Sequence, residues 1–165
     1  MIFPFLIFFT SFILEGVLSN FLSLNSYFLP LFSLVSLIII YPFFHRKEMN
    51  YLKMCALFGF FYDITYTDTF LVNTIIFAFL GFFILFIITW LSNNFLNSGL
   101  LALILTVLYR ILYYFLLFFC GYSSFSLKNL FISINHSLIG NVFYAIVLYF
   151  VVDYISYKKH IEKID

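Results

Sequence analysis

The sequence contains very little charge. Only 9% of its 165 residues are Asp, Glu, Lys or Arg, whereas 65% are apolar and 25% are aromatic. The mean hydropathy is +1.12. So few charged residues could not supply the polar surface that a soluble domain of this composition would need. The composition therefore excludes a soluble protein and indicates an integral membrane protein.

Patterns that serve enzymes and metal sites are also lacking. The chain contains no GxSxG, HExxH, Walker or GxGxxG motif. Its two cysteines, Cys55 and Cys120, lie in apolar runs without CxxC spacing, so we expect them to be buried and bound to no metal. The histidines lie at or beyond the ends of the predicted helices. We therefore expect no catalytic residue, no metal and no cofactor.

Linkers long enough to separate domains are missing too, so residues 1–165 are predicted to form one polytopic domain. A spanning helix needs about 20 apolar residues. The third candidate is the weakest because it is short and contains Lys53 and Asp63, and five spans remain possible. We predict an all-α membrane bundle of six transmembrane helices with a short third one. The six segments are Ile2–Leu18, Phe28–Phe44, Met49–Ile64, Phe70–Leu91, Ser98–Cys120 and Ser137–Tyr157.

The basic residues predict the orientation, because Lys and Arg in short loops favour the cytoplasmic side. With six spans and a cytoplasmic amino terminus, only Lys128 lies outside. The cytoplasmic residues are then Arg46, Lys47, Lys53, Lys158, Lys159 and Lys163. We therefore expect both termini in the cytoplasm.

Arg110 is the most unusual residue of the predicted spans, because it lies roughly 15–18 Å from either end of the fifth segment. An unpaired arginine at that depth costs about 2.5–3.5 kcal/mol on insertion scales. We expect an intramembrane charge pair with a carboxylate. Asp63 lies about 15 Å beyond Lys53, level with Arg110 if the third helix begins there. Glu15, late in the first segment, is the alternative partner.

The last predicted helix carries a stripe of small and polar residues, which is common where helices pack closely in lipid. Packing between helices is its simplest interpretation. Together with the preceding Ser133, the stripe comprises Ser137, Gly140, Asn141 and Tyr144.

The stretch "FGFFYDITYTDTFLVNTIIFAFLGFFI" resembles the central signature of the MreD family of bacterial rod shape-determining membrane proteins. In that signature a glycine is followed four residues later by an aspartate at the end of a short helix. Gly59, Asp63 and Asn73 match it, whereas Leu71 and Val72 stand where the family usually has a small residue, most often glycine. The stretch "FPFLIFFTSFILEGVL" resembles family first helices that end in an acid or amide, which carries Glu15 over.

The resemblance implies a non-enzymatic subunit of the inner membrane that binds an MreC-like bitopic protein and helps to control peptidoglycan synthesis and cell shape. The further partners it implies are MreB, a SEDS glycosyltransferase, a class B penicillin-binding transpeptidase and membrane lipid, with no nucleic acid. It also implies a fold similar to the substrate-binding subunits of energy-coupling-factor transporters.

Two other functions remain open. A vitamin-binding subunit of such a transporter would often carry an Ala-x-x-x-Ala pattern in its first helix, and the first predicted helix has no alanine. A membrane enzyme acting on lipid-linked substrates would use Asp63 and Asp68 as acid and base or as metal ligands. That alternative lacks a third carboxylate or a histidine cluster.

Overall fold

The computed structural model describes residues 2–22, 28–44, 47–67, 71–90, 94–121 and 126–160, and all regular structure within these ranges is helical. The all-helical fold class is thereby confirmed. The elements are α1 (Ile2–Leu22), α2 (Phe32–Ile40), the 3-10 helix η1 (Tyr41–Phe44), α3 (Glu48–Tyr66), α4 (Val72–Ile88), α5 (Phe95–Phe119) and α6 (Leu127–Lys158).

The shortest helix is α2 with nine residues, and not the third, which has 19, so the prediction of a short third helix is wrong. Helix α2 is also much shorter than the predicted segment Phe28–Phe44. Residues 28–31 are not helical, because Pro30 disfavours a helical conformation at Leu29. The amide of Leu29 instead donates to the carbonyl of His136 in α6 at 3.1 Å. At the other end, the chain tightens into η1 around Pro42. All nine residues of α2 are buried, as expected for a helix that is apolar on every side.

Helix α6 begins at Leu127, ten residues before the predicted start at Ser137. The prediction placed these residues in a loop because several of them are polar. Two features support the longer helix: Leu130 is buried, and the hydroxyl of Tyr114 bonds both the amide and the carbonyl of Ser126 just before the helix. The helix therefore extends well beyond the predicted span.

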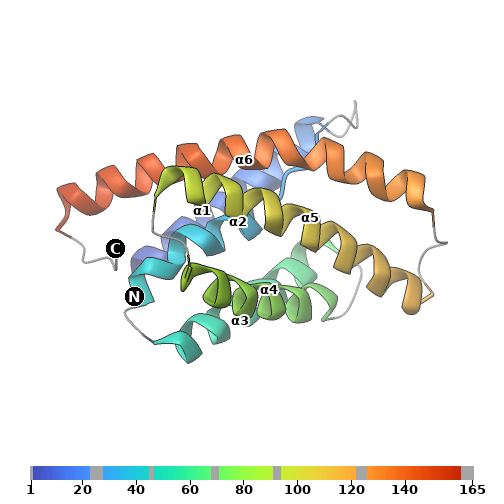
Figure 1. The fold of residues 1–165 in the computed structure, drawn as a ribbon, viewed down its shortest axis with the longest axis horizontal. Coiled ribbons are helices and arrows are strands. Elements are labelled where there is room, and N and C mark those ends of the chain that lie inside the picture. The colour runs from blue at the N-terminus through green and yellow to red at the C-terminus, as the bar shows by residue number, and fades with distance from the viewer. Residues whose placement is uncertain are drawn as a thin grey trace.

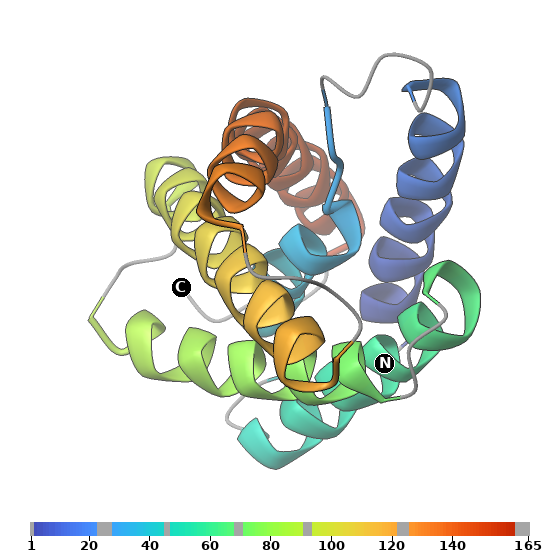
Figure 2. The ribbon, with the colours of Figure 1, turned by 90° about the vertical axis from the view of Figure 1, so that its right-hand side faces the viewer.

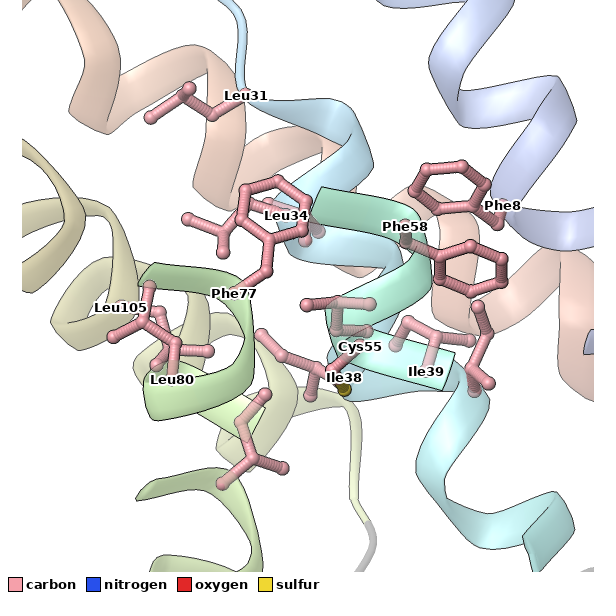
Figure 3. Close-up of a cluster of buried hydrophobic side chains, with 14 of the residues drawn as sticks. Phe8, Leu31, Leu34, Ile38, Ile39, Cys55, Phe58, Phe77, Leu80 and Leu105 are labelled. Carbon is pink, nitrogen blue, oxygen red and sulfur yellow. The ribbon is translucent and has the colours of Figure 1, made fainter. Parts of the chain in front are cut away.

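The core surrounds α2, which packs against α1, α4, α5 and α6. Figure 3 shows Leu34, Ile38 and Ile39 of α2 among side chains from the surrounding helices, including Phe77 and Leu80 of α4. Between α1 and α3 the core is aromatic, with Phe8 and Phe58 stacked at 3.7 Å between ring centroids. Cys55 is also buried here.

Outside this core the helices expose apolar side chains, as a membrane protein does. Three helices, α1, α5 and α6, are long and apolar enough to cross a membrane, and α2 with η1 and α4 are shorter apolar helices. Cys120 at the end of α5 is exposed, so its predicted burial is wrong. The chain is a multi-pass membrane protein.

The long helices α5 and α6 lie side by side and form one edge of the bundle, while α3 and α4 form a second pair (Figures 1 and 2). At the right of Figure 1, α5 and α6 extend past the C-terminal end of α3 and the N-terminal end of α4.

Candidate functional site

The N-terminal end of α4 is capped by a carboxylate from another helix. Leu71, the residue that precedes α4, has no side chain that can cap. Asp63, in the last turn of α3, accepts hydrogen bonds from the backbone amides of Asn73 at 3.0 Å and Thr74 at 2.8 Å. The same carboxylate accepts from the Asn73 side-chain amide at 2.9 Å and the Thr74 hydroxyl at 2.9 Å. Free amides at a helix start attract an anion, and here Asp63 supplies it.

Gly59 makes this cap possible by letting the two helices approach closely. It lies one turn before Asp63 on the same face of α3. A Cβ atom at this position would lie 2.5 Å from the carbonyl oxygen of Asn73 and 2.7 Å from the Cα of Thr74. Because both are backbone atoms, they cannot move aside as a side chain could. Only glycine therefore allows the first turn of α4 to rest on α3.

Asn73 extends the cap to a third helix. Its side-chain oxygen accepts a hydrogen bond from the hydroxyl of Tyr109 in α5 at 2.7 Å, and the side chain is fully buried. The three signature residues Gly59, Asp63 and Asn73 therefore form one joint among α3, α4 and α5. The structure also shows why a small residue would suit the position before α4, since Leu71 has a φ of 61°, a conformation that favours glycine.

Glu15 caps the N-terminal end of α2 in the same manner. One carboxylate oxygen accepts from the backbone amide of Ser33 in the first turn of α2 at 2.8 Å. The other accepts from the hydroxyl of Tyr62 in α3 at 2.6 Å. Asn141 of α6 completes the cap, because its side-chain oxygen accepts from the amide of Leu31 at 2.8 Å. Glu15 is only 2% exposed.

Arg110 does not form the predicted pair with Asp63. Its Nε donates to the hydroxyl of Ser137 at 2.8 Å and its Nη2 to the carbonyl of Leu29 at 3.4 Å. Arg110 and Asp63 lie at a similar depth, but the side chain of Arg110 points to a different side of the bundle. Tyr109 reaches Asn73 beside Asp63, but the next residue on a helix points about 100° away, so Arg110 turns toward α6. Glu15 attracts Arg110 electrostatically, although both of its oxygens accept hydrogen bonds from other groups.

The polar stripe of α6 faces the inside of the bundle. Ser137 accepts from Arg110 and donates to the carbonyl of Ser133 at 2.7 Å. The hydroxyl of Tyr144 donates to Ser11 at 2.8 Å, and its ring stacks on Phe32. Gly140 lies directly against the ring of Phe28, so a larger residue would displace it. Together with Asn141, the stripe holds α2 and α5 against α6 and joins α6 to α1 through the hydrogen bond of Tyr144.

Several members of this site carry no signal in the sequence. Three of them lie next to residues that were singled out: Tyr62 beside Asp63, Tyr109 beside Arg110 and Thr74 beside Asn73. No pattern in the sequence marked these three as hydrogen-bonding groups. The backbone amides of Ser33 and Leu31 could not be recognised either, because α2 was predicted to start earlier. Asp68, which the membrane-enzyme alternative would use as an acid, a base or a metal ligand, lies outside the described residues. The arrangement anchors the ends of two short helices.

Comparison with known proteins gives one result. The family model described as rod shape-determining protein MreD matches residues 1–158, nearly the entire chain. No curated protein and no solved structure matches.

Proposed function

Since the chain belongs to the MreD family of rod shape-determining proteins, we propose that it is a non-enzymatic subunit of the bacterial cell-elongation complex. In this role it binds an MreC-like bitopic membrane protein and helps to control peptidoglycan synthesis and cell shape. MreB, a SEDS glycosyltransferase and a class B penicillin-binding transpeptidase are the further partners that we propose. The proposed fold is a compact bundle similar to the substrate-binding subunits of energy-coupling-factor transporters.

The hydrogen bonds that the buried polar groups make to helix ends support this function best. Asp63, Glu15 and Asn141 each hold the start of a short helix. Such contacts fix the shape of the bundle. The outer faces of the helices are apolar, including Phe79 and Phe82 of α4. A rigid bundle with apolar faces suits a protein that acts by contacting other helices within the membrane, where association depends on close packing.

We also propose that the chain crosses the inner membrane six times with both termini in the cytoplasm, and that the second crossing is made by residues 28–44, of which α2 and η1 are the helical part. The N-terminal end of α1 and the C-terminal end of α6 lie on the same side of the bundle (Figure 1). Lys158 and Lys159 lie at that end of α6, and Lys128 lies at the opposite end. Reporter fusions after Lys159 should be cytoplasmic and fusions near Lys128 external. An external carboxy terminus would contradict the six-span topology.

The partner can be identified by crosslinking in native membranes. A photoreactive amino acid would replace exposed phenylalanines one at a time, at Phe9 of α1, Phe79 of α4, Phe118 of α5 and Phe143 of α6. Replacement of the fully buried Phe77 serves as the control. We expect at least one exposed position to capture an MreC-like protein through its single transmembrane helix. Capture of no such protein, together with copurification of a vitamin, would contradict the proposed function.

A further inference from the structure

The two helix pairs of the bundle differ in the length of their apolar surface. The outward side of α3 is polar near both ends, where Lys53 and Thr65 are exposed. Between them lie exposed apolar side chains such as Phe60, over a rise of about 18 Å. On α4 the exposed apolar side chains run from Ile75 to Trp90, a rise of about 22 Å. The hydrocarbon core of a bilayer is about 30 Å thick, so the outward face of the α3–α4 pair is shorter than the core.

The α5–α6 pair, in contrast, is long enough for the whole membrane. Lys128 and Lys158 lie at the two ends of α6, about 45 Å apart along the helix. This distance matches the full thickness of a bilayer with its headgroups, about 40–45 Å. Exposed apolar side chains continue along α6 from Phe131 to Tyr157. In a membrane that fits α5 and α6, the α3–α4 pair therefore leaves part of the thickness uncovered.

The uncovered part lies at one end of the bundle. Tyr109 bonds Asn73 in the first turn of α4, so the start of α4 is level with Tyr109 of α5. Beyond that level α5 continues to Phe119, a further rise of about 15 Å. The C-terminal end of α3 lies beside the start of α4, because Asp63 caps it. Figure 1 shows that both of these helix ends stop short of the ends of α5 and α6.

Tilting of the bundle does not remove this deficit. A tilted helix covers less height than an upright one, so tilt makes a short helix shorter still. The side chain of Lys53 can extend toward its membrane surface, but it adds length only at the opposite end of α3. The last four carbonyls of a helix have no partner within it, and a backbone group without a partner is costly in hydrocarbon. The Thr67 hydroxyl bonds one of them, the carbonyl of Asp63, at 3.3 Å. Water satisfies such carbonyls, and hydrocarbon does not.

We propose that the bilayer thins beside the outward face of α3 and α4, so that lipid headgroups and water reach the C-terminal end of α3. The partner of this face is then a lipid leaflet thinner than the leaflet beside α5 and α6. Bilayers adapt to short apolar segments in this way at a modest cost. The inference rests on the proposed six-span topology, in which α3 and α4 each cross the membrane.

The test labels thiols in vesicles that contain the purified full-length chain, diluted so that most vesicles hold a single copy. The reagent is a membrane-impermeant maleimide, which reacts with a thiolate and therefore needs water at the thiol. Cys120, exposed at the end of α5, is the reference, and Cys55 is buried. The reporter is Thr65→Cys combined with Cys120→Ser. Because positions 65 and 120 lie at the same end of the bundle, mixed orientations in the vesicles affect both equally.

In dioleoyl phosphatidylcholine we expect Thr65→Cys to react within about threefold of the rate of Cys120, because thinning places both thiols in water. Leu57→Cys, also combined with Cys120→Ser, is the matched control. Leu57 is exposed on α3 about two turns deeper than Thr65. Its cysteine should react at least about tenfold more slowly, because hydrocarbon suppresses formation of the thiolate.

Vesicles of dimyristoleoyl phosphatidylcholine have a thinner bilayer and provide the check on folding. The end of α3 reaches water there without local thinning, so labelling of Thr65→Cys shows that the variant is intact and its thiol reactive. Protection of the same thiol in dioleoyl lipid would then overturn the proposal. Equal labelling of Thr65→Cys and Leu57→Cys in dioleoyl lipid would overturn it too, because water would reach the whole face. The test needs no partner protein, and reporter fusions test the topology separately, so its failure leaves the proposed function standing.

Discussion

The two short helices α2 and α4 start inside the bundle and are anchored in different ways. The cap of α4 comes from the preceding helix, and Asp63 is 10 and 11 residues from the amides it accepts. The cap of α2 comes from several parts of the chain. Glu15 is 18 residues from Ser33, and Asn141 is 110 residues from Leu31. The start of α4 thus depends on a local hairpin, whereas the start of α2 depends on the assembled bundle.

The chemistry of the two caps differs as well. The Asp63 carboxylate accepts from two backbone amides, a hydroxyl and a side-chain amide of the first turn of α4, and also from the hydroxyl of Thr67 just after α3. The Glu15 carboxylate accepts from one backbone amide and one tyrosine hydroxyl. Asn141 provides the remaining cap of α2 without any charge. The negative charge should therefore matter more at α4 than at α2.

Asp63→Asn should have the largest effect, because an amide has only one acceptor oxygen. Its NH₂ group would face the amide of Asn73 or Thr74, donor against donor. We expect a loss of about 3 kcal/mol in the free energy of unfolding, from lost bonds to a charged group and an unsatisfied buried amide. Unfolding of the purified protein in mixed micelles with increasing SDS measures this loss.

Asp153→Asn is the control for that measurement, because Asp153 is an exposed acid on α6. Exposed substitutions usually change stability by less than about 0.5 kcal/mol. Equal losses from Asp63→Asn and Asp153→Asn would show that the cap of α4 does not depend on the carboxylate.

Gly59→Ala should have the next largest effect and tests whether the approach of the helices is needed for the cap. The added Cβ would overlap the backbone of Asn73 and Thr74 and push the first turn of α4 away from Asp63. We expect a loss of about 2 kcal/mol, as overpacking usually costs. Gly99→Ala is the matched control, since a Cβ there meets Ile146 at an ordinary 3.4 Å. If both substitutions are tolerated equally, the contact at Gly59 is not close in the membrane.

Glu15→Gln should cost less, about 1 kcal/mol, because a glutamine fits the two bonds at α2. Its oxygen can still accept from the amide of Ser33, and its NH₂ can donate to the oxygen of Tyr62. The same SDS titration measures the loss. A loss as large as that of Asp63→Asn would contradict the difference between the two caps, because the charge would then be needed equally at both helices.

Sequence reasoning found the elements and the main residues of this site but not their contacts. The helical character and the presence of six helices could be predicted, because long apolar runs separated by turn residues leave few alternatives. Gly59, Asp63 and Asn73 could be found through the family resemblance. Their joint role could not be found, since it depends on where α4 begins and on a close approach between two backbones.

The sequence predicted the level of a residue along its helix better than the direction in which its side chain points. Counting residues placed Asp63 and Arg110 at one level, and the bond between Asn73 and Tyr109 shows that they lie near it. The direction of Arg110 depends on the rotation of α5 about its own axis. A helix that is apolar on most sides gives little information about that rotation. The shortening of α2 had a different cause: Pro30 and Pro42 lie beyond its two ends, but the prediction followed the length of the apolar run alone.

The smallest effect we predict is the coupling between Asp63 and Arg110. In the structure the two side chains have different partners, Asp63 in α4 and Arg110 in α6 and the segment before α2. The losses from Asp63→Asn and Arg110→Gln should therefore add, with a coupling energy below about 0.5 kcal/mol. A double-mutant cycle on SDS unfolding measures it.

The pair Arg110→Gln and Ser137→Ala is the positive arm of that cycle, because Nε of Arg110 bonds the Ser137 hydroxyl at 2.8 Å. Side chains in direct contact usually couple by 0.5 kcal/mol or more, so this pair should exceed the first. A third arm combines Arg110→Gln with Glu15→Gln, whose charges attract at longer range. Its coupling should fall between the other two. If Asp63 couples to Arg110 more strongly than Ser137 does, the two charges pair directly in the membrane. Asp63 would then not act only as the cap of α4.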